Sequence, residues 1–342
     1  MIAGTEAKGA AAPLLELRAV SKRFGSPASL VSRFATLIGA REREQVVSAV
    51  ENVDLAIAEG EVVGLIGESG CGKSTLGRLA VGLRKPSAGE RFWRGEPCDR
   101  ADGVAARARQ LKMQMIFQDP YAALNPRLRV IDIVGEAPVA HGLIGERQQI
   151  EYVGLQLNRV GLDPTLMRRF AHQFSDGQRI RIGLARALSV KPELLVCDEP
   201  VATLDLSIRA QLLNLFMDLR AALDLTYLFV SQELGVVRQL SDRVMIMYLG
   251  RIVESGPTQE VLAAPNHPYT QALRAAAVGL ESPRRTSIPV KGDVPTSLAR
   301  PAGCAFHPRC PHVMPRCKEA VPRLEPIAPG RSSACYLNTT AA

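Results

Sequence analysis

The chain has 342 residues, a length that accommodates two or three compact units. Apolar residues make up 46 % and charged residues 22 % of the sequence, which excludes disorder, collagen and coiled coil as the dominant state. A net charge of +8 is compatible with nucleic acid, anionic lipid or phosphorylated ligands, and seven cysteines, an odd number, argue against a secreted disulfide framework.

The N-terminus carries no sign of a targeting signal, because no basic start followed by an apolar core is present. No apolar run approaches the ~20 residues that span a bilayer. We therefore expect the protein to stay in the cytosol with reduced thiols, and residues 1–13 to form a flexible N-terminus.

A glycine-rich segment separates a predicted strand, residues 62–66, from a predicted helix, residues 76–83. It matches the P-loop pattern in full, and its glycines let backbone N–H groups converge on phosphate oxygens. Lys73 is placed to contact the terminal phosphates of a nucleotide, and the Ser74 hydroxyl to bind Mg²⁺. We predict that nine residues bind the nucleotide: Gly67, Glu68, Ser69, Gly70, Cys71, Gly72, Lys73, Ser74 and Thr75.

Paired carboxylates, Asp198 and Glu199, end a second apolar run over 194–197. Parallel strands deliver their carboxyl ends to the ligand-binding edge of an α/β sheet, so we expect both side chains near the P-loop. Asp198 suits the Mg²⁺ shell, and Glu199 suits polarising or deprotonating an attacking water. Together with the P-loop, this pair indicates a nucleotide hydrolase.

A third motif, Phe-Ser-Asp-Gly-Gln-Arg over 174–179, precedes an apolar helical stretch over 180–188. With these motifs in this order, the sequence resembles the ATP-binding subunits of ABC transporters, and most closely those of oligopeptide and dipeptide importers. The resemblance covers residues 14 to 335. It implies an α/β fold: a P-loop NTPase (RecA-like) ABC cassette over 14–262, with a helical subdomain at about 121–184. A small, irregular, Cys/Pro-rich C-terminal domain is expected over 263–342.

The resemblance also implies roles for residues outside the P-loop and the acidic strand. Phe24 occupies the position of a ring that packs on adenine, and Gln118 that of a glutamine sensing Mg²⁺ and the attacking water. Ser175, Gly177 and Gln178 match the signature loop, which completes the ATP site of a second cassette.

The implied function is ATP hydrolysis that powers import of oligopeptides, dipeptides or similar small solutes. The implied partners are a second ABC cassette, two transmembrane permease subunits and an extracytoplasmic substrate-binding protein, at the cytoplasmic face of the inner or plasma membrane. Two alternatives stay open: a soluble ABC ATPase acting on nucleic acid, and a non-hydrolysing regulatory subunit. The single cassette and the absence of heptads argue against nucleic acid as a partner.

Two positions depart from the family pattern. Asp176 stands where the signature has glycine, and Gln232 stands where the family has a histidine that contacts the γ-phosphate. Glutamine donates a hydrogen bond but carries no positive charge, so we predict a reduced catalytic contribution from Gln232. Because the two departures affect different composite sites, a heterodimer of cassettes with asymmetric ATP sites is expected.

The C-terminal region concentrates charge and cysteine. Residues 281–342 hold nine Lys and Arg against four Asp and Glu. The spacing of the four cysteines is wider than the pairs that zinc sites favour, and it suits a [4Fe–4S] cluster, a pattern that peptide importers also carry. Zinc and a metal-free set of packed thiols are the alternatives. The predicted cluster ligands are Cys304, Cys310, Cys317 and Cys335.

Overall fold

Twelve strands form two sheets in the computed structural model, which describes residues 12–25, 46–99, 103–281 and 300–340. Most of the predicted N-terminal segment 1–13 therefore lies outside the described residues. The strands are β1 (Leu15–Gly25), β2 (Val46–Ile57), β3 (Val62–Ile66), β4 (Ala88–Trp93), β5 (Glu96–Pro97), β6 (Met113–Ile116), β7 (Leu194–Asp198), β8 (Thr226–Ser231), β9 (Arg243–Tyr248), β10 (Arg251–Pro257), β11 (Glu325–Ala328) and β12 (Arg331–Ser333).

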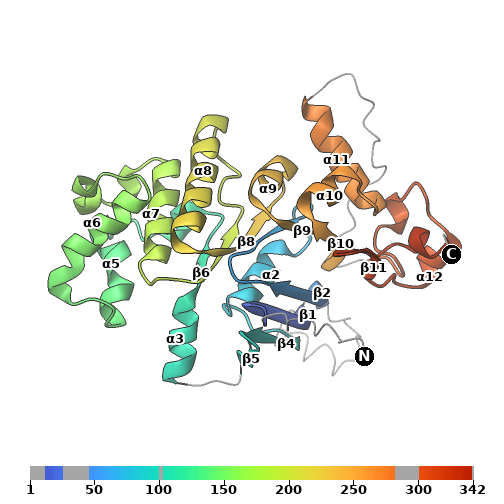
Figure 1. Ribbon diagram of the computed structural model, residues 1–342, viewed down its shortest axis with the longest axis horizontal. Helices are drawn as coiled ribbons and strands as arrows, with labels where there is room; N and C mark the ends of the chain where they lie inside the picture. Colours follow the sequence, from blue (N-terminus) through green and yellow to red (C-terminus); the bar gives the residue numbers. More distant parts are fainter. Residues whose placement is uncertain (1–11, 26–45, 100–102, 282–299, 341–342) are drawn as a thin grey trace, which may run out of the picture.

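The helices surround the larger sheet, with α5, α6 and α7 gathered at one end of the molecule and α11 and α12 at the other (Figure 1). None of the helices in the described ranges has the length and apolarity that crossing a membrane requires. The α-helices are α2 (Lys73–Ala80), α3 (Val104–Lys112), α4 (Pro120–Ala123), α5 (Val130–Ala140), α6 (Gln149–Arg159), α7 (Asp176–Leu188), α8 (Leu206–Leu223), α9 (Leu234–Leu240), α10 (Thr258–Ala263), α11 (Pro268–Glu281) and α12 (Pro315–Glu319).

The larger sheet has the order β11-β12-β10-β9-β3-β8-β7-β6, and its β9, β3, β8, β7 and β6 strands are parallel. Every residue of β3, β7 and β8 is buried, as expected of parallel strands that helices cover on both faces. The predicted strand over 62–66 and the acidic strand are confirmed. The predicted helix over 76–83 instead begins at Lys73 and ends at Ala80, because the P-loop turn ends at Gly72.

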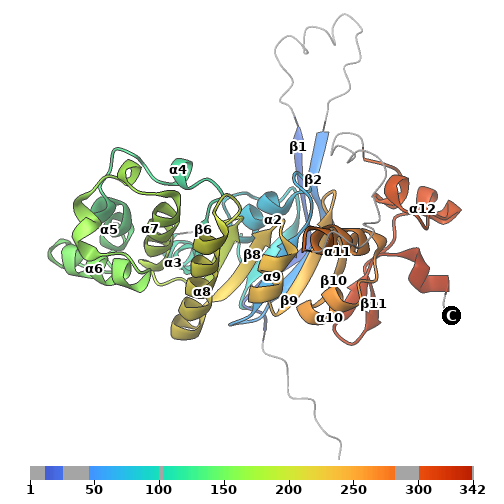
Figure 2. The same ribbon diagram turned by 90° about the horizontal axis from the view of Figure 1, so that it is seen from above.

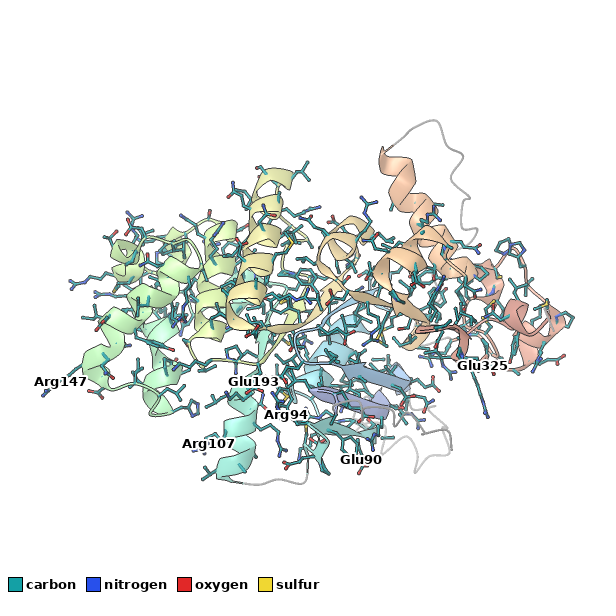
Figure 3. The ribbon with its side chains drawn as sticks, in the orientation of Figure 1. Glu90, Arg94, Arg107, Arg147, Glu193 and Glu325 are labelled. Carbon is teal, nitrogen blue, oxygen red and sulfur yellow. The ribbon has the colours of Figure 1, made fainter. Side chains whose placement is uncertain are left out.

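The smaller antiparallel sheet, in the order β2-β1-β4-β5, packs with α2 against the parallel sheet. Leu76 and Leu79 of α2 are fully buried in the core that joins both sheets. At the edge of this contact, Arg94 pairs with Glu59 at 2.7 Å and with Glu193 at 3.0 Å, and Figure 3 shows the Arg94 and Glu193 side chains close together. The P-loop helix is thus held between two sheets.

The C-terminal residues join the cassette's own sheet. Strand β12 pairs with β10, and β11 pairs with β12. Figures 1 and 2 place this region opposite the α5–α7 end of the molecule. Phe306 packs in the same core as Tyr248 of β9, Tyr269 of α11 and Ile66, the residue that ends β3 just before the P-loop. The sheet therefore brings the C-terminal region close to the glycine-rich segment.

Candidate functional site: a phosphate-binding loop and its acidic strand

The glycine-rich segment forms a tight turn between β3 and α2. Gly72 has φ of 109°, a left-handed conformation, and a Cβ built there would lie 2.1 Å from the Ala49 carbonyl oxygen. A Cβ at Gly67 would lie 2.3 Å from the Met247 carbonyl oxygen. Only glycine avoids both clashes, and the turn leaves the amino end of α2 aimed at the ligand side of the sheet.

Lys73 holds the centre of this turn. Its side chain is only 3 % exposed, and its Nζ donates to the carbonyl oxygens of Gly67 at 2.8 Å and Glu68 at 3.0 Å. The same Nζ lies 3.5 Å from Oε1 of Glu199. The lysine therefore connects the loop to the acidic strand, and the sequence prediction that Lys73 contacts the terminal phosphates stays a prediction.

Ser74 and Asp198 are the two residues that the sequence predicts to bind Mg²⁺, and they lie in contact. The Ser74 hydroxyl donates to Asp198 Oδ1 at 2.8 Å, whereas Oδ2 is buried without a hydrogen-bond partner. Burial raises the pKa of Asp198, and the neighbouring Glu199 charge raises it further. A hydroxyl and a carboxylate with an unused buried oxygen are the hard donors that Mg²⁺ prefers, so these two residues fit that ion.

The Glu199 carboxylate accepts hydrogen bonds from the other two predicted catalytic side chains. Gln232 Nε2 donates to its Oε1 and Oε2 at 2.8 and 2.9 Å, and Gln118 Nε2 donates to Oε2 at 3.2 Å. Glu199 itself is 6 % exposed and has φ of 48°, a strained conformation for a non-glycine residue. The structure thus brings together residues from the ends of three strands, β6, β7 and β8.

The signature loop lies on α7 and away from α2 in both views (Figures 1 and 2). Ser175 is the N-cap of α7, where its hydroxyl accepts from Gln178 N–H and the Gln178 side chain accepts from Ser175 N–H. The Asp176 carboxylate turns back on its own helix and pairs with Arg179 at 3.1 Å. Gly177, Ser175 and Gln178 are therefore not assembled with this chain's own P-loop.

Phe24 lies near the end of β1, opposite Val47 of β2. Its side chain is 37 % exposed, and Lys22 Nζ lies 5.6 Å from the ring centroid. The predicted adenine-contacting ring is thus accessible on the small sheet.

The remaining P-loop residues differ in exposure. Cys71 is buried, and this burial raises the pKa of its thiol. Ser69 and Gly70 are exposed, whereas Glu68 and Thr75 are half-buried. The exposed stretch marks the side of the loop that an incoming ligand can reach.

The four C-terminal cysteines, which were predicted as cluster ligands, converge on one cavity. All four are among the residues that line this cavity. Burial raises the pKa of the Cys304 thiol to about 11. All four are free thiols, and the described part of the chain has no group of three or more ligands arranged for a metal ion. The predicted [4Fe–4S] cluster and its zinc alternative are not supported here.

Two residues far along the chain reach the P-loop without having been predicted to. The Tyr269 hydroxyl accepts from the backbone N–H of Glu68 at 2.9 Å, and Arg309 pairs with the Glu68 carboxylate at 2.9 Å. Neither residue stands in a recognised motif of nucleotide binding. Both residues are positioned by the packing of Tyr248, Tyr269 and Phe306, which come from separate segments of the chain, so local sequence patterns do not reveal the contacts.

Comparisons with known proteins agree with this geometry. The "ABC transporter" family model matches residues 50–202, and the "Oligopeptide/dipeptide transporter, C-terminal region" model matches residues 253–317. The chain is 42 % identical to the oligopeptide transport ATP-binding protein AppF of Bacillus subtilis, over 95 % of this chain and 97 % of the relative. It is 41 % identical to the dipeptide transport ATP-binding protein DppF of Haemophilus influenzae, over 86 % and 90 %.

Solved structures share the fold at lower identity. The cbiO1 structure from Clostridium perfringens matches with a TM-score of 0.61 and 24 % identity, over 80 % of this chain and 97 % of that chain. The ADP- and phosphate-bound dimer of the ATP-binding cassette MJ0796 matches with a TM-score of 0.60 and 24 % identity, over 71 % and 98 %. By its sequence relatives and its fold, the chain is an ABC ATPase and belongs to the oligopeptide/dipeptide family of transporter ATP-binding subunits.

Proposed function

We propose that this chain binds and hydrolyses ATP to power the import of oligopeptides or dipeptides at the cytoplasmic face of a membrane. The observation that carries the proposal is the convergence of Lys73, Ser74 and Asp198 with the Gln118–Glu199–Gln232 group at one edge of the parallel sheet. Relatives named for oligopeptide and dipeptide transport support the choice of cargo.

The division of labour follows from the contacts. Lys73 neutralises the terminal phosphates. Ser74 and Asp198 would hold Mg²⁺, which would supply charge stabilisation for phosphoryl transfer when bound. Glu199 accepts a proton from, or orients, the attacking water, and Gln118 fixes the carboxylate from the side of β6. We also propose that Phe24 packs on the adenine ring and that Ser175, Gly177 and Gln178 complete the site of a second cassette.

Transport requires permease subunits. A groove beside Gln118 is suited to binding them. A cavity of about 310 Å³ opens between the parallel sheet and the helical end of the molecule. Its lining includes Leu83, which is 51 % exposed, and Phe117, the neighbour of Gln118. A Leu83→Glu variant is expected to lose co-purification with the permease while retaining ATP binding.

A second, non-identical cassette is the partner that the departures in sequence favour. Gln232 belongs to the site on this chain's own P-loop, and Asp176 belongs to the site on the partner's P-loop. We further propose that 14–262 is the cassette and 263–342 the accessory domain, and that an extracytoplasmic binding protein delivers the cargo.

Uptake of a labelled oligopeptide tests the proposed function directly. A strain lacking this chain is expected to recover uptake when it expresses the wild type but not when it expresses Lys73→Ala. Lys85→Ala, at an exposed position after α2, is the matched control and is expected to restore uptake. Equal uptake by Lys73→Ala would refute an ATP-driven role, and ATPase activity without any peptide uptake would refute the cargo.

A further inference from the structure

We propose that Arg309 is a positioning residue of the nucleotide site: together with Tyr269 it holds Glu68, and so the P-loop, in the conformation that receives the triphosphate. The C-terminal region thereby sets the affinity of the cassette for ATP. This inference rests on ATP binding at the P-loop and is independent of which solute is transported.

The contact between Arg309 and Glu68 is bidentate. Nη1 donates to Oε2 at 2.9 Å, and Nη2 donates to Oε1 at 3.1 Å. The guanidinium is only 7 % exposed, and the Glu68 side chain 26 %. A charge pair in this planar, partly dehydrated geometry is more directional than an exposed lysine pair.

The surroundings of Arg309 fix its position. Nη1 also donates to the Tyr248 hydroxyl at 3.3 Å, and the guanidinium lies 5.9 Å from the Phe306 ring centroid. Burial opposes its charge, yet the ion pair with Glu68 prevails and keeps the pKa of Arg309 above its ordinary value. Arg309 Nε is buried without a hydrogen-bond partner. The contacts of Nη1 and Nη2 therefore keep the side chain in place although one buried donor stays unsatisfied.

A second contact fixes the backbone of the same P-loop residue. Tyr269 is only 1 % exposed, and its hydroxyl accepts a hydrogen bond from Glu68 N–H at 2.9 Å. Tyr269 packs against Tyr248 and Phe306, with ring centroids 4.6 and 5.5 Å away. Glu68 is therefore held at both its main chain and its side chain by residues that follow the cassette's P-loop by about 200 positions or more.

These contacts have an electrostatic and a geometric consequence for ATP. A carboxylate on a loop that binds a triphosphate repels it, and Arg309 cancels that charge without entering the phosphate site itself. A loop already held in its binding conformation also loses less conformational freedom when the ligand arrives. Both effects act on nucleotide affinity more than on the hydrolytic step at Glu199.

The test measures the Kd of Mg-ATP for the full-length chain by calorimetry, alongside the Tm of each variant without nucleotide. Arg309→Met is expected to raise the Kd about tenfold, because it leaves the Glu68 charge unpaired beside the phosphates. The double variant Arg309→Met/Glu68→Gln is expected to return to within about threefold of the wild type, since no uncompensated carboxylate is left.

Arg316→Met is the matched control, because Arg316 lies in the same region and stacks on Tyr336 at 4.4 Å rather than on the P-loop. Its ATP affinity is expected to equal that of the wild type. A merely structural Arg309 would lower the Tm in the single and the double variant alike and would show no rescue by Glu68→Gln. That pattern, or an unchanged Kd in Arg309→Met, would overturn the proposal.

If Arg309→Met does not fold, a second variant tests the same proposal. Tyr269→Phe removes only the hydroxyl that accepts from Glu68 N–H, and we expect it to raise the Kd for ATP about threefold with little change in kcat. A Kd equal to that of the wild type in this variant would contradict the role of the C-terminal region. Because the readout is ATP binding to the isolated chain, failure here is distinct from failure of peptide uptake.

Discussion

Gln232 donates through one amide nitrogen to both carboxylate oxygens of Glu199, at 2.8 and 2.9 Å. The contact keeps the carboxylate in place beside Lys73, yet the amide can neither accept a proton nor carry a charge. An imidazole at the same position would supply both properties near neutral pH. Glutamine at position 232 therefore keeps the hydrogen bonds that hold the Glu199 carboxylate but supplies no positive charge to stabilise the phosphoryl group.

Gln232→His is expected to raise the ATPase rate of the chain about tenfold, because a cationic donor then faces the developing charge on the phosphoryl group. Steady-state phosphate release measures the change. Gln239→His, at an exposed position on α9, serves as the control for adding a histidine. A rate unchanged by Gln232→His would show that position 232 does not limit hydrolysis.

Glu199→Gln is expected to abolish most hydrolysis, by about 10²-fold or more, while leaving ATP bound. The amide oxygen can still accept from Gln118 and Gln232 at the position of Oε2, whereas the bond at Oε1 is lost, and an amide is a poor base. ATP retention after rapid gel filtration, compared with phosphate release, separates the two effects. A non-hydrolysing regulatory subunit would instead show the same turnover of the assembled complex with either residue.

Asp176→Gly is expected to leave the ATPase rate of the assembled complex within about twofold of the wild type, since the carboxylate already pairs with Arg179 on its own helix. The ion pair offsets the carboxylate charge that would otherwise face the partner's nucleotide. Asp176→Asn is the matched isosteric control. A large gain in activity with glycine would show that the ion pair opens when the two cassettes close.

Asp198→Asn is expected to raise the Tm of the nucleotide-free chain by about 1–3 °C while abolishing Mg²⁺-dependent hydrolysis. Burial raises the pKa of this carboxyl, so the folded state favours the proton and the ionised form opposes folding at neutral pH. The Ser74 hydroxyl keeps an acceptor in the amide oxygen. Differential scanning fluorimetry measures the shift, and a lower Tm would contradict this account.

We expect the buried imidazole of His267 to lower the free energy of unfolding as the pH falls. Burial lowers the pKa of its imidazole to about 3, and Nδ1 accepts from Tyr269 N–H. Below the unfolded-state pKa of about 6.5, His267 binds a proton in the unfolded chain but not in the folded chain. The free energy of unfolding therefore loses about 1.4 kcal/mol per pH unit from this residue, down to about pH 3. His267→Gln is expected to have a shallower decline of unfolding free energy between about pH 6 and pH 4 than the wild type.

The matched control for that experiment is His141→Gln, at an exposed position after α5, which is expected to leave the pH profile unchanged. Denaturant titrations at each pH give the unfolding free energies. An equal acid sensitivity of wild type and His267→Gln would show that other groups dominate the profile.

The parts of the site that sequence could predict are those encoded in one continuous segment. The P-loop carries its own turn glycines, and the apolar run before Asp198 is long enough only for a strand, so both elements appear where expected. The ligand edge then follows from the parallel topology, which brings Ser74 and Asp198 together.

The parts that sequence could not predict depend on pairing between distant segments. Nothing local to Arg309 indicates that its partner is Glu68, because the contact requires the Tyr248–Tyr269–Phe306 packing to be in place first. The four cysteines were predicted as ligands from their spacing, and the fold brings them around one cavity, but among the described residues no group of three or more is arranged to hold a metal ion.

The pairing of β12 with β10 also bears on how the chain is made. Glu254 of β10 is fully buried, and it is held by Arg331 and by the backbone N–H groups that open α11. On a ribosome, β10 emerges well before β12, so until β12 is synthesised the edge of β10 is uncovered and the Glu254 carboxylate lacks its arginine. Premature stops between β10 and β12 would therefore release cassettes prone to edge-to-edge aggregation, although every nucleotide-binding motif had been translated.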